Sequence, residues 1–396
     1  MSDHSPSSDS PENRVSRREM LWRVGGTLAA VGGGVWATRR LYDPRGDAGL
    51  RPPEAASLKN FFESLYADWG ASTPRVSVAR AAAGGGVADG GGDDVSPELI
   101  RKLLAAALAP MGGIERFIHK GDTVLVKPNV AFDRGPAMGA TTNPRVVAEV
   151  VQLCRGAGAR RVLVADNPIE KAEPCFAKSR IREAAERAGA EVILPAAAHF
   201  SPVVIRDRDP DPRRNEALGT WEVFFKPLAV ADKVIGLPPI KDHNLCFASM
   251  GIKNWYGLLC GRRNQFHQAI HDIVSDLGMM MSPTLVLVDG TRVLMKNGPT
   301  GGRLEDVAIG GVSGAPTIVA GVDPVATDAW CLQHLLGRDP GKLRYLELAE
   351  QKIGMRIEAG RRSGADGAAQ AAGRRFASRD WPAYQRQGLI VEANVA

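Results

Sequence analysis

The sequence predicts an α/β fold built on a mostly parallel sheet with helices on both faces. Short apolar runs that look like buried strands alternate with segments whose apolar residues recur at helical spacing. The strand-like runs, such as "VLV" (124–126), "RVLVA" (161–165) and "LVLV" (285–288), are apolar almost throughout. Continuous apolar strands are typical of a sheet covered on both faces. We also consider a second, smaller α/β subdomain.

The composition is that of a globular protein. The chain has 396 residues, of which 44% are hydrophobic and 24% charged, so it is long enough to bury a sizeable core. Its net charge of +6 is scattered, and part of it lies in the first forty residues, which carry six arginines against four acids. No basic stripe interleaved with aromatic residues is present, so we expect no nucleic-acid partner.

The first forty residues resemble a twin-arginine export signal. Arg17 and Arg18 precede an apolar, Gly/Ala-rich run at 24–37, and a second basic pair follows at 39–40. The run is shorter than the roughly 20 residues that a spanning helix needs. The alternative is a disordered basic tail. We therefore expect export in the folded state by the twin-arginine machinery to the periplasm or another extracytoplasmic compartment, with N-terminal membrane anchoring if the segment is not cleaved.

Next along the chain come a linker and the first elements of the sheet. Residues 41–75 are expected to form a linker with a candidate helix at 57–70, and the alternating run 75–81 predicts a strand. Ser96 and Pro97 have the residue types preferred at the cap and first position of a helix, and Gly112 with Gly113 would end it.

From residue 123 onward, strands and helices alternate regularly. Pro144 opens a helix that closes at the glycine-rich segment 156–158, and Pro324 opens another after a buried strand. We expect the α/β domain to span 76–360 and a Gly/Ala/Arg-rich tail to span 361–396. Further strands are predicted at 122–129, 160–168, 191–196, 221–225, 233–237, 284–292 and 317–321, and further helices at 179–190 and 266–283.

Polar residues collect where the predicted strands end. In open α/β sheets, ligands bind outside the carboxyl ends of the strands, so we expect these groups to converge on one side. The residues at these ends are Lys127 and Asn129, Asp166, Lys241 with His243, Asp289 with Arg292, and Asp323.

A structural explanation competes with this interpretation. An aspartate after a buried strand often caps the next helix; a cap is the favoured role for Asp323, whereas for Asp166 the two roles are evenly balanced. Lysine has no capping use at a helix N-terminus, where the dipole repels it. Lys127 and Lys241 therefore favour an anionic ligand or a carboxylate partner.

Three histidines lie within a short stretch of sequence. His267 and His271 are four residues apart, a spacing that puts them on one face of a helix and suits two ligands of one metal ion. His243 is a candidate third ligand. Acid–base catalysis and simple packing are the alternatives that this spacing leaves open. The cofactor is therefore unknown, with a divalent metal as one option.

Three sets of candidate site residues follow. The catalytic candidates are His243, His267, Lys127 and Lys241. The substrate-binding candidates are Asn129, Lys253, Asn254, Arg292, Lys296 and Asn297. The candidate metal ligands are Asp166, His243, His267, His271 and Asp289.

Several familiar sites are absent from the sequence. The five cysteines form no C-x-x-C pair, so we expect no iron–sulfur cluster. Cys154 and Cys331 lie in apolar helical patterns and are expected to be buried. There is no phosphate-binding GxxxxGK[ST], no GxGxxG after a strand and no GxSxG, so nucleotide binding and α/β-hydrolase chemistry have no support.

Eight segments of the chain match one protein family in order and spacing: "VLVKPNV", "TTNP", "VLVADNP", "VIGLPPIKDHNL", "MGIKNWYGLL", "FHQAIHDI", "LVLVDGTRVLMKNGPTGG" and "GVDPVATDAW". On these segments the chain resembles the domain of unknown function 362 family, from about Val76 to Gly354. Some members of this family carry a ferredoxin-type cluster domain, whose cysteines this chain lacks. The family is also distantly similar to the amino-terminal half of nickel-dependent lactate racemases, which implies a site for a small anionic substrate or a metal cofactor.

The sequence thus predicts an exported enzyme that acts on a small anionic molecule. Proton-transfer or isomerase-type chemistry, with an optional divalent metal at the carboxyl ends of the strands, is the first hypothesis. The alternative is a non-catalytic periplasmic protein that binds a ligand or a metal in the same pocket.

Overall fold

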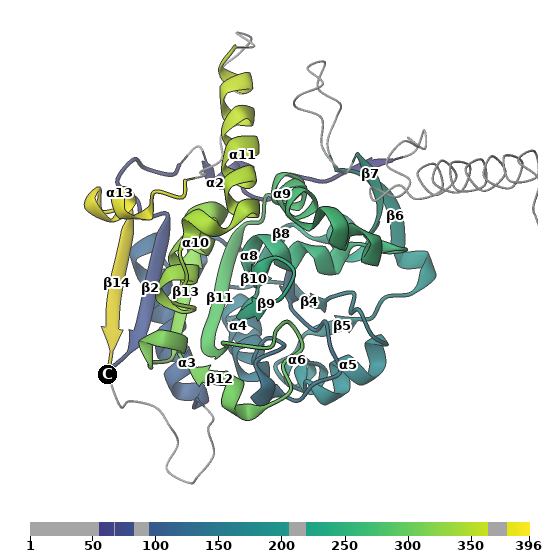
Figure 1. The fold of residues 1–396 in the computed structure, drawn as a ribbon, viewed down its shortest axis with the longest axis horizontal. Helices are drawn as coiled ribbons and strands as arrows, with labels where there is room; N and C mark the ends of the chain where they lie inside the picture. The colour runs from purple at the N-terminus through teal and green to yellow at the C-terminus, as the bar shows by residue number, and fades with distance from the viewer. Residues whose placement is uncertain (1–54, 67, 83–94, 206–218, 363–377) are drawn as a thin grey trace, which may run out of the picture.

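A computed structural model describes residues 55–66, 68–82, 95–205, 219–362 and 378–396. The expected signal or anchor at 1–40 lies outside these residues. One 11-stranded sheet dominates the structure (Figure 1). Its continuous path runs in the order β14 (Ile390–Val395), β2 (Val76–Ala81), β13 (Thr317–Gly321), β11 (Leu285–Leu294), β8 (Lys233–Leu237), β3 (Thr123–Pro128), β4 (Arg161–Ala165) and β5 (Glu191–Ile193).

Three short strands attach to this sheet, and a small second sheet lies beside it. Both β9 (Pro239–His243) and β12 (Val307–Ile309) pair with β11, and β10 (Phe247–Ser249) pairs with β9. The small sheet has the order β1 (Ala56–Ser57), β6 (Phe200–Val204) and β7 (Thr220–Phe224).

Most neighbouring strands of the large sheet are parallel, which confirms the predicted fold class. The strands β11, β8, β3, β4 and β5 run parallel to one another, but β13 is antiparallel to both β11 and β2. The expectation that all the strand ends converge is therefore wrong for Asp323, which follows β13 and lies at the opposite edge. Nor does β11 end at Asp289, because it continues to Leu294.

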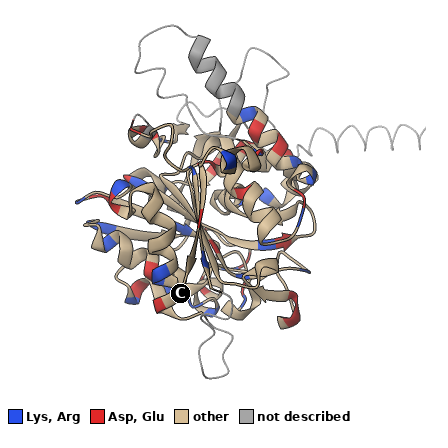
Figure 2. Cartoon of the chain, turned by 90° about the vertical axis from the view of Figure 1, so that its left-hand side faces the viewer, with Lys and Arg blue, Asp and Glu red and all other residues tan. Residues whose placement is uncertain are grey.

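Two helical layers cover the sheet, and the strands supply apolar side chains to both. In β3, Val124 and Val126 point into one hydrophobic core and Leu125 into the other, as the alternation of a strand requires. Figure 2 shows the sheet as a narrow layer between helices. One core receives α3 (Pro97–Leu108), α4 (Pro144–Gly156), α5 (Ala172–Lys178) and α6 (Ile181–Arg187). The other receives α8 (Gly251–Asn254), α9 (Ile270–Met280), α10 (Pro324–His334) and α11 (Arg344–Arg362).

The predicted helix starts are confirmed by their capping hydrogen bonds. The Ser96 hydroxyl accepts a hydrogen bond from the Leu99 N–H at 3.2 Å, and Asn143 accepts one from the Arg145 N–H at 3.0 Å. In both helices proline occupies the first position, where its missing N–H costs nothing.

Other elements differ from the sequence expectation. The helix expected at 266–283 begins as a 3₁₀ segment, η7 (Arg263–Ala269), and becomes α-helical only at Ile270. The strand β14 and the helix α5 were not predicted. The remaining described elements are 3₁₀ turns and three short helices, α2 (Glu63–Tyr66), α7 (Lys226–Val230) and α13 (Trp381–Arg386).

The cysteines carry no disulfide among the described residues. Cys154 and Cys331 are buried as predicted, Cys175 and Cys246 are buried as well, and Cys260 is partly exposed. Within the described ranges, no helix has both the length and the apolar character required to cross a bilayer.

Candidate functional site

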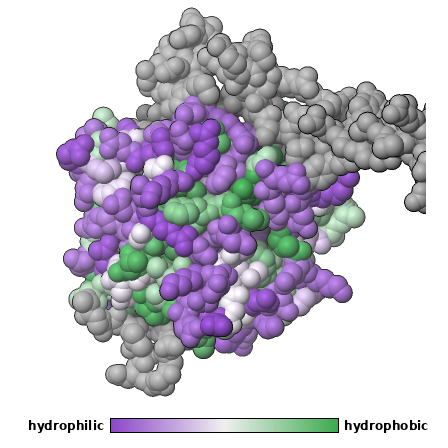
Figure 3. All heavy atoms as spheres, viewed as in Figure 1, coloured by the Kyte–Doolittle hydropathy of each residue, from purple (hydrophilic) through white to green (hydrophobic). Residues whose placement is uncertain are grey.

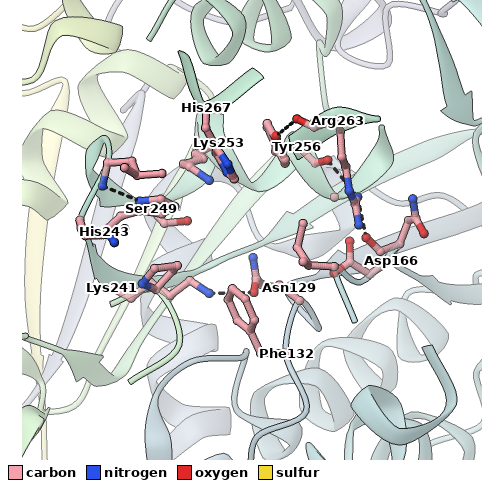
Figure 4. Close-up of a pocket in the computed structure, with 17 residues that line it drawn as sticks. Asn129, Phe132, Asp166, Lys241, His243, Ser249, Lys253, Tyr256, Arg263 and His267 are labelled. Atoms are coloured by element: carbon pink, nitrogen blue, oxygen red, sulfur yellow. Dashed lines mark hydrogen bonds between the residues drawn. The ribbon is translucent and has the colours of Figure 1, made fainter. Parts of the chain in front are cut away.

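A cavity of about 230 Å³ opens beyond the carboxyl ends of β3 and β4 and beside β9 and β10. The segments that follow these parallel strands meet there because the strand ends share one edge of the sheet. Figure 4 shows polar side chains from several elements surrounding an open space. The lining residues are Asn129, Ala131, Phe132, Asp166, Asn167, Ile169, Lys241, His243, Asn244, Leu245, Ser249, Lys253, Tyr256, Gly257, Arg263, His267 and Pro299.

A buried ion pair forms the back of the cavity. Lys127 Nζ lies 2.7 Å from Asp166 Oδ1, and both side chains are almost completely buried. The second carboxylate oxygen of Asp166 accepts a hydrogen bond from the Val130 N–H at 2.7 Å. Burial lowers the pKa of Lys127, while the neighbouring Asp166 opposes that shift. The carboxylate charge of Asp166 is therefore already balanced, and Lys127 supports the cavity from behind rather than lining it.

Lys241 lines the cavity and donates two hydrogen bonds. Its Nζ donates to the Ala140 carbonyl at 2.6 Å and to Asn129 Oδ1 at 3.0 Å. Burial, followed by the nearby charge of Lys253, lowers the pKa of Lys241 to about 7. At neutral pH this amine is therefore divided between its charged and its neutral form.

Two asparagines connect Lys241 to the buried ion pair. Asn129 Nδ2 donates to Asn254 Oδ1 at 3.2 Å, and Asn254 Nδ2 donates to the Lys127 carbonyl at 3.1 Å. Lys127 Nζ also contacts Asn254 Oδ1 at 3.3 Å. Asn254, a predicted substrate-binding residue, therefore supports Asn129 and does not itself line the cavity.

Lys253 is the cation with the fewest partners in the cavity. It belongs to α8, is only 8% exposed, and its ammonium lies 4.8 Å from the centre of the Tyr256 ring. Within the described part of the chain, its Nζ forms no hydrogen bond or ion pair. Burial lowers its pKa. Such an ammonium is ready to accept an anionic partner.

His243 is held in a neutral form with a defined tautomer. Its Nδ1 accepts a hydrogen bond from the Leu245 N–H at 3.2 Å, so the proton resides on Nε2. Burial, with the charges of Lys253 and Lys241, lowers the pKa of His243 to about 2. The group that His243 offers is therefore an uncharged Nε2–H donor.

His267 also lines the cavity, whereas His271 does not. The His267 ring is stacked on Tyr256, with 6.2 Å between the ring centres and 6° between their planes. His271 instead stacks on Tyr345, with ring centres 6.3 Å apart. The two histidines belong to different elements, because the chain changes from the 3₁₀ segment η7 to α9 between them. The shared helical face that their spacing predicts does not form.

Arg263 is a cavity residue that the sequence analysis missed. Its guanidinium donates to the carbonyls of Asn167 and Leu259, each at 2.9 Å, and also to that of Pro168. These bonds tie the segment after β4 to the segment after α8. The donors are thus occupied by backbone oxygens, but the positive charge of Arg263 remains beside the cavity.

Three of the predicted substrate-binding residues lie away from the cavity. Lys296 is exposed, Asn297 donates to Asp306 Oδ2 at 2.8 Å, and Arg292 is buried within β11. Their loop reaches the cavity through Pro299 instead.

Asp289, a predicted metal ligand, has a structural environment. Its carboxylate accepts hydrogen bonds from the Asn143 N–H at 2.8 Å and from the Thr291 hydroxyl at 2.6 Å. Among the described residues, no group of three or more His, Cys, Asp or Glu side chains is placed to hold a metal ion. The geometry of the described residues therefore lends no support to the metal hypothesis.

The chain was compared with protein-family models, with known proteins and with solved structures. A family model described as a domain of unknown function (DUF362) matches residues 124–333. A thylakoid-associated protein of Synechocystis sp. is 28% identical over 260 residues, which cover 64% of this chain and 74% of that protein. A crystal structure of a Thermotoga maritima protein aligns at 12% identity with a TM-score of 0.29, over 51% of this chain and about half (52%) of that one.

Proposed function

From the premise that this chain belongs to the DUF362 family, we propose that it binds a small anionic molecule in the cavity and exchanges a proton with it. The observation that carries this proposal is the pairing of the buried charges. Lys241, Lys253 and Arg263 border the cavity, and its carboxylate, Asp166, is already neutralised by Lys127.

An anion would satisfy the groups that the protein leaves without partners. Burying a charge is costly unless it is paired and hydrogen-bonded. A carboxylate or phosphate group next to the Lys253 ammonium would supply that pair, and the neutral Nε2–H of His243 is available as a further donor. His243 belongs to β9 and Lys253 to α8, so both side chains come from regular elements of the fold.

Lys241 has the features of a general base. A neutral lysine amine has two N–H groups and one lone pair, and the Ala140 carbonyl and Asn129 Oδ1 account for two donors. The lone pair then remains for a substrate proton. A base with a pKa of about 7 has a substantial neutral fraction at physiological pH. This feature favours proton transfer over binding alone.

We also propose that the protein works at an extracytoplasmic membrane surface. The twin-arginine-like segment at 1–40 and the similarity to a thylakoid-associated protein of Synechocystis support this setting. Export of the folded protein by the twin-arginine machinery belongs to the same proposal.

Binding is tested by titrating the folded protein with lactate, malonate and inorganic phosphate in a calorimeter. We expect at least one of these anions to bind, and we expect Lys253→Met to weaken that binding tenfold or more. Lys296→Met is the matched control, since Lys296 is exposed outside the cavity. A wild-type protein that binds none of these anions would contradict the proposal.

Proton transfer is tested by following hydrogen–deuterium exchange at the carbon next to the carboxylate of a bound ligand, by NMR in D₂O. We expect exchange to rise as the pH passes about 7, where Lys241 loses its proton, and to be lost in Lys241→Met. Binding without any exchange in the wild type would leave the non-catalytic ligand-binding function in its place.

A further inference from the structure

We infer that the ligand of the cavity is an amphipathic anion, with its acidic group inside the cavity and an apolar tail across the mouth. This inference rests on the proposed anion binding and specifies the class of molecule. It comes from a feature that the charges do not explain, namely the exposed apolar side chains at the cavity rim.

Exposed large apolar side chains are few among the described residues, and two of them border the cavity. Ile169 is 42% exposed and Leu245 is 48% exposed, and both belong to the cavity lining. The others, such as Val230 at 47%, lie elsewhere. Apolar groups that gather at a concave site mark a place where an apolar partner is bound.

The polar and apolar groups occupy different depths. Lys241, Lys253 and Ser249 are between 1% and 8% exposed, whereas Ile169 and Leu245 are about half exposed. The charged groups therefore lie at the bottom and the aliphatic groups at the rim. Figure 3 shows hydrophobic atoms near the middle of this face of the molecule, amid hydrophilic surroundings.

Backbone hydrogen bonds fix both rim residues in place. The Ile169 N–H donates to the Ala131 carbonyl at 3.1 Å, and the Leu245 N–H donates to His243 Nδ1 at 3.2 Å. Phe132 is partly exposed and also lines the cavity, with the centre of its ring 5.0 Å from Lys241 Nζ. An apolar tail that leaves the acidic group would thus pass Phe132 and reach Ile169 and Leu245.

The size of the cavity favours a tail that extends outward. A volume of about 230 Å³ is below the range of about 300–1,000 Å³ that is usual for enclosed ligand sites. A carboxylate with a few carbons would occupy it, so the remainder of a longer molecule would lie over the rim.

The test is calorimetric titration of the folded protein with acetate, butanoate, hexanoate and octanoate below their aggregation concentrations. Each added methylene that contacts the rim is expected to tighten binding by about twofold to fourfold. Leu245→Ser and Ile169→Ser should each reduce this gain. Val230→Ser, at an equally exposed position in α7, should change nothing.

The outcomes separate this inference from the proposed function. If acetate and octanoate bind equally well, or if Val230→Ser reduces the gain as much as Leu245→Ser, the amphipathic ligand is ruled out while anion binding stands. If none of the four carboxylates binds, the amphipathic ligand is ruled out, and the titration with lactate, malonate and phosphate decides whether anion binding stands. A second experiment uses phosphatidylcholine vesicles with and without oleate. If the protein pellets with the oleate vesicles but not with the plain ones, the amphipathic anion can be bound from a membrane.

Discussion

Two regions of this protein differ in the sign of their buried charged groups and in the partners of those groups. Around α10, the buried charges are carboxylates that are satisfied by backbone N–H groups. Asp323 accepts from the N–H groups of Val325 and Ala326 at 3.0 and 2.9 Å, and Asp328 accepts from those of Gly251 and Ile252 at 2.8 and 3.0 Å. In the cavity, the buried charges are mainly lysines, and Lys253 has no such partner among the described residues.

The difference shows which buried charges serve the fold and which serve a ligand. The first N–H groups of a helix have no partner within the helix. A carboxylate can accept hydrogen bonds from them, so an aspartate at this position caps the helix. The same N–H groups cannot satisfy an ammonium. A buried lysine must find carbonyl or carboxylate oxygens, as Lys127 does with Asp166. Where it does not, as at Lys253, its charge remains for a molecule that enters the cavity.

The largest effect is expected from a substitution that disturbs Lys127, the buried lysine with a carboxylate partner. A Cβ added at Gly257 would lie 2.2 Å from Asp166 Oδ1 and 2.9 Å from Lys127 Nζ. Gly257→Ala must therefore separate the buried ion pair, and breaking such a pair costs about 3–5 kcal/mol. We expect a corresponding loss in the free energy of unfolding, measured by urea denaturation.

Gly302→Ala is the matched control for this change. A Cβ at Gly302 would meet no atom within 4 Å, so its stability should change by less than about 1 kcal/mol. Equal stability of Gly257→Ala and wild type would show that the Lys127–Asp166 contact is not maintained in solution.

A smaller effect is expected at Asp328, a buried carboxylate that accepts hydrogen bonds from backbone N–H groups. Burial raises the pKa of Asp328 to about 7, so between about pH 4 and 7 the folded state holds a proton that the unfolded state releases. This group therefore adds stability at low pH, and the addition is lost as the pH rises towards 7, by about 1.4 kcal/mol per pH unit. Asp328→Asn should remove that slope and cost about 1–3 kcal/mol at pH 5, because an amide offers only one acceptor oxygen to the two N–H donors.

The control is Asp339→Asn, at an exposed cap that accepts a hydrogen bond from the Gly341 N–H at 2.8 Å. Its thermal unfolding should keep the wild-type dependence on pH. A slope that persists unchanged in Asp328→Asn would assign the pH dependence to other groups, such as Asp323, whose pKa burial raises to about 6.

The smallest effect tests the unsatisfied lysine and has the opposite sign. Lys253→Met keeps the apolar stem and removes an ammonium that burial disfavours. We expect stability to rise by on the order of 1 kcal/mol in the absence of ligand, as is common when a residue kept for function is replaced. If Lys253→Met instead destabilises the protein as much as Asp328→Asn does, Lys253 belongs with the structural charges.

The sequence predicts the parallel half of the fold well and the rest less well. Apolar strands followed by capped helices identify β3, α4 and β4, because each element is encoded locally. The direction of β13 depends on how the chain returns to the sheet, which no local pattern reports. The strand β14 follows a long low-complexity segment and pairs with residues about 300 positions away, so its alternation alone does not reveal its neighbour.

The candidate site, too, is predicted by the sequence only in part. Polar strand ends point to Lys127, Asp166, Lys241 and His243, because parallel strands deliver their ends to one edge. Which lysine receives the carboxylate is a matter of three-dimensional contact, and the sequence alone could not distinguish Lys127 from Lys241. The two-histidine pattern misled because it assumes α-helical geometry where the chain forms a 3₁₀ segment.

The pairing of β14 with β2 has a consequence for the order of events during synthesis. Val76 is aligned with Ile390, so one edge of β2 has no partner until more than 300 further residues have been made. An unpaired edge strand is a template for pairing with other chains, and contacts so distant in sequence form slowly. The interval between synthesis of β2 and arrival of β14 is therefore the period in which newly made chains are most exposed to aggregation.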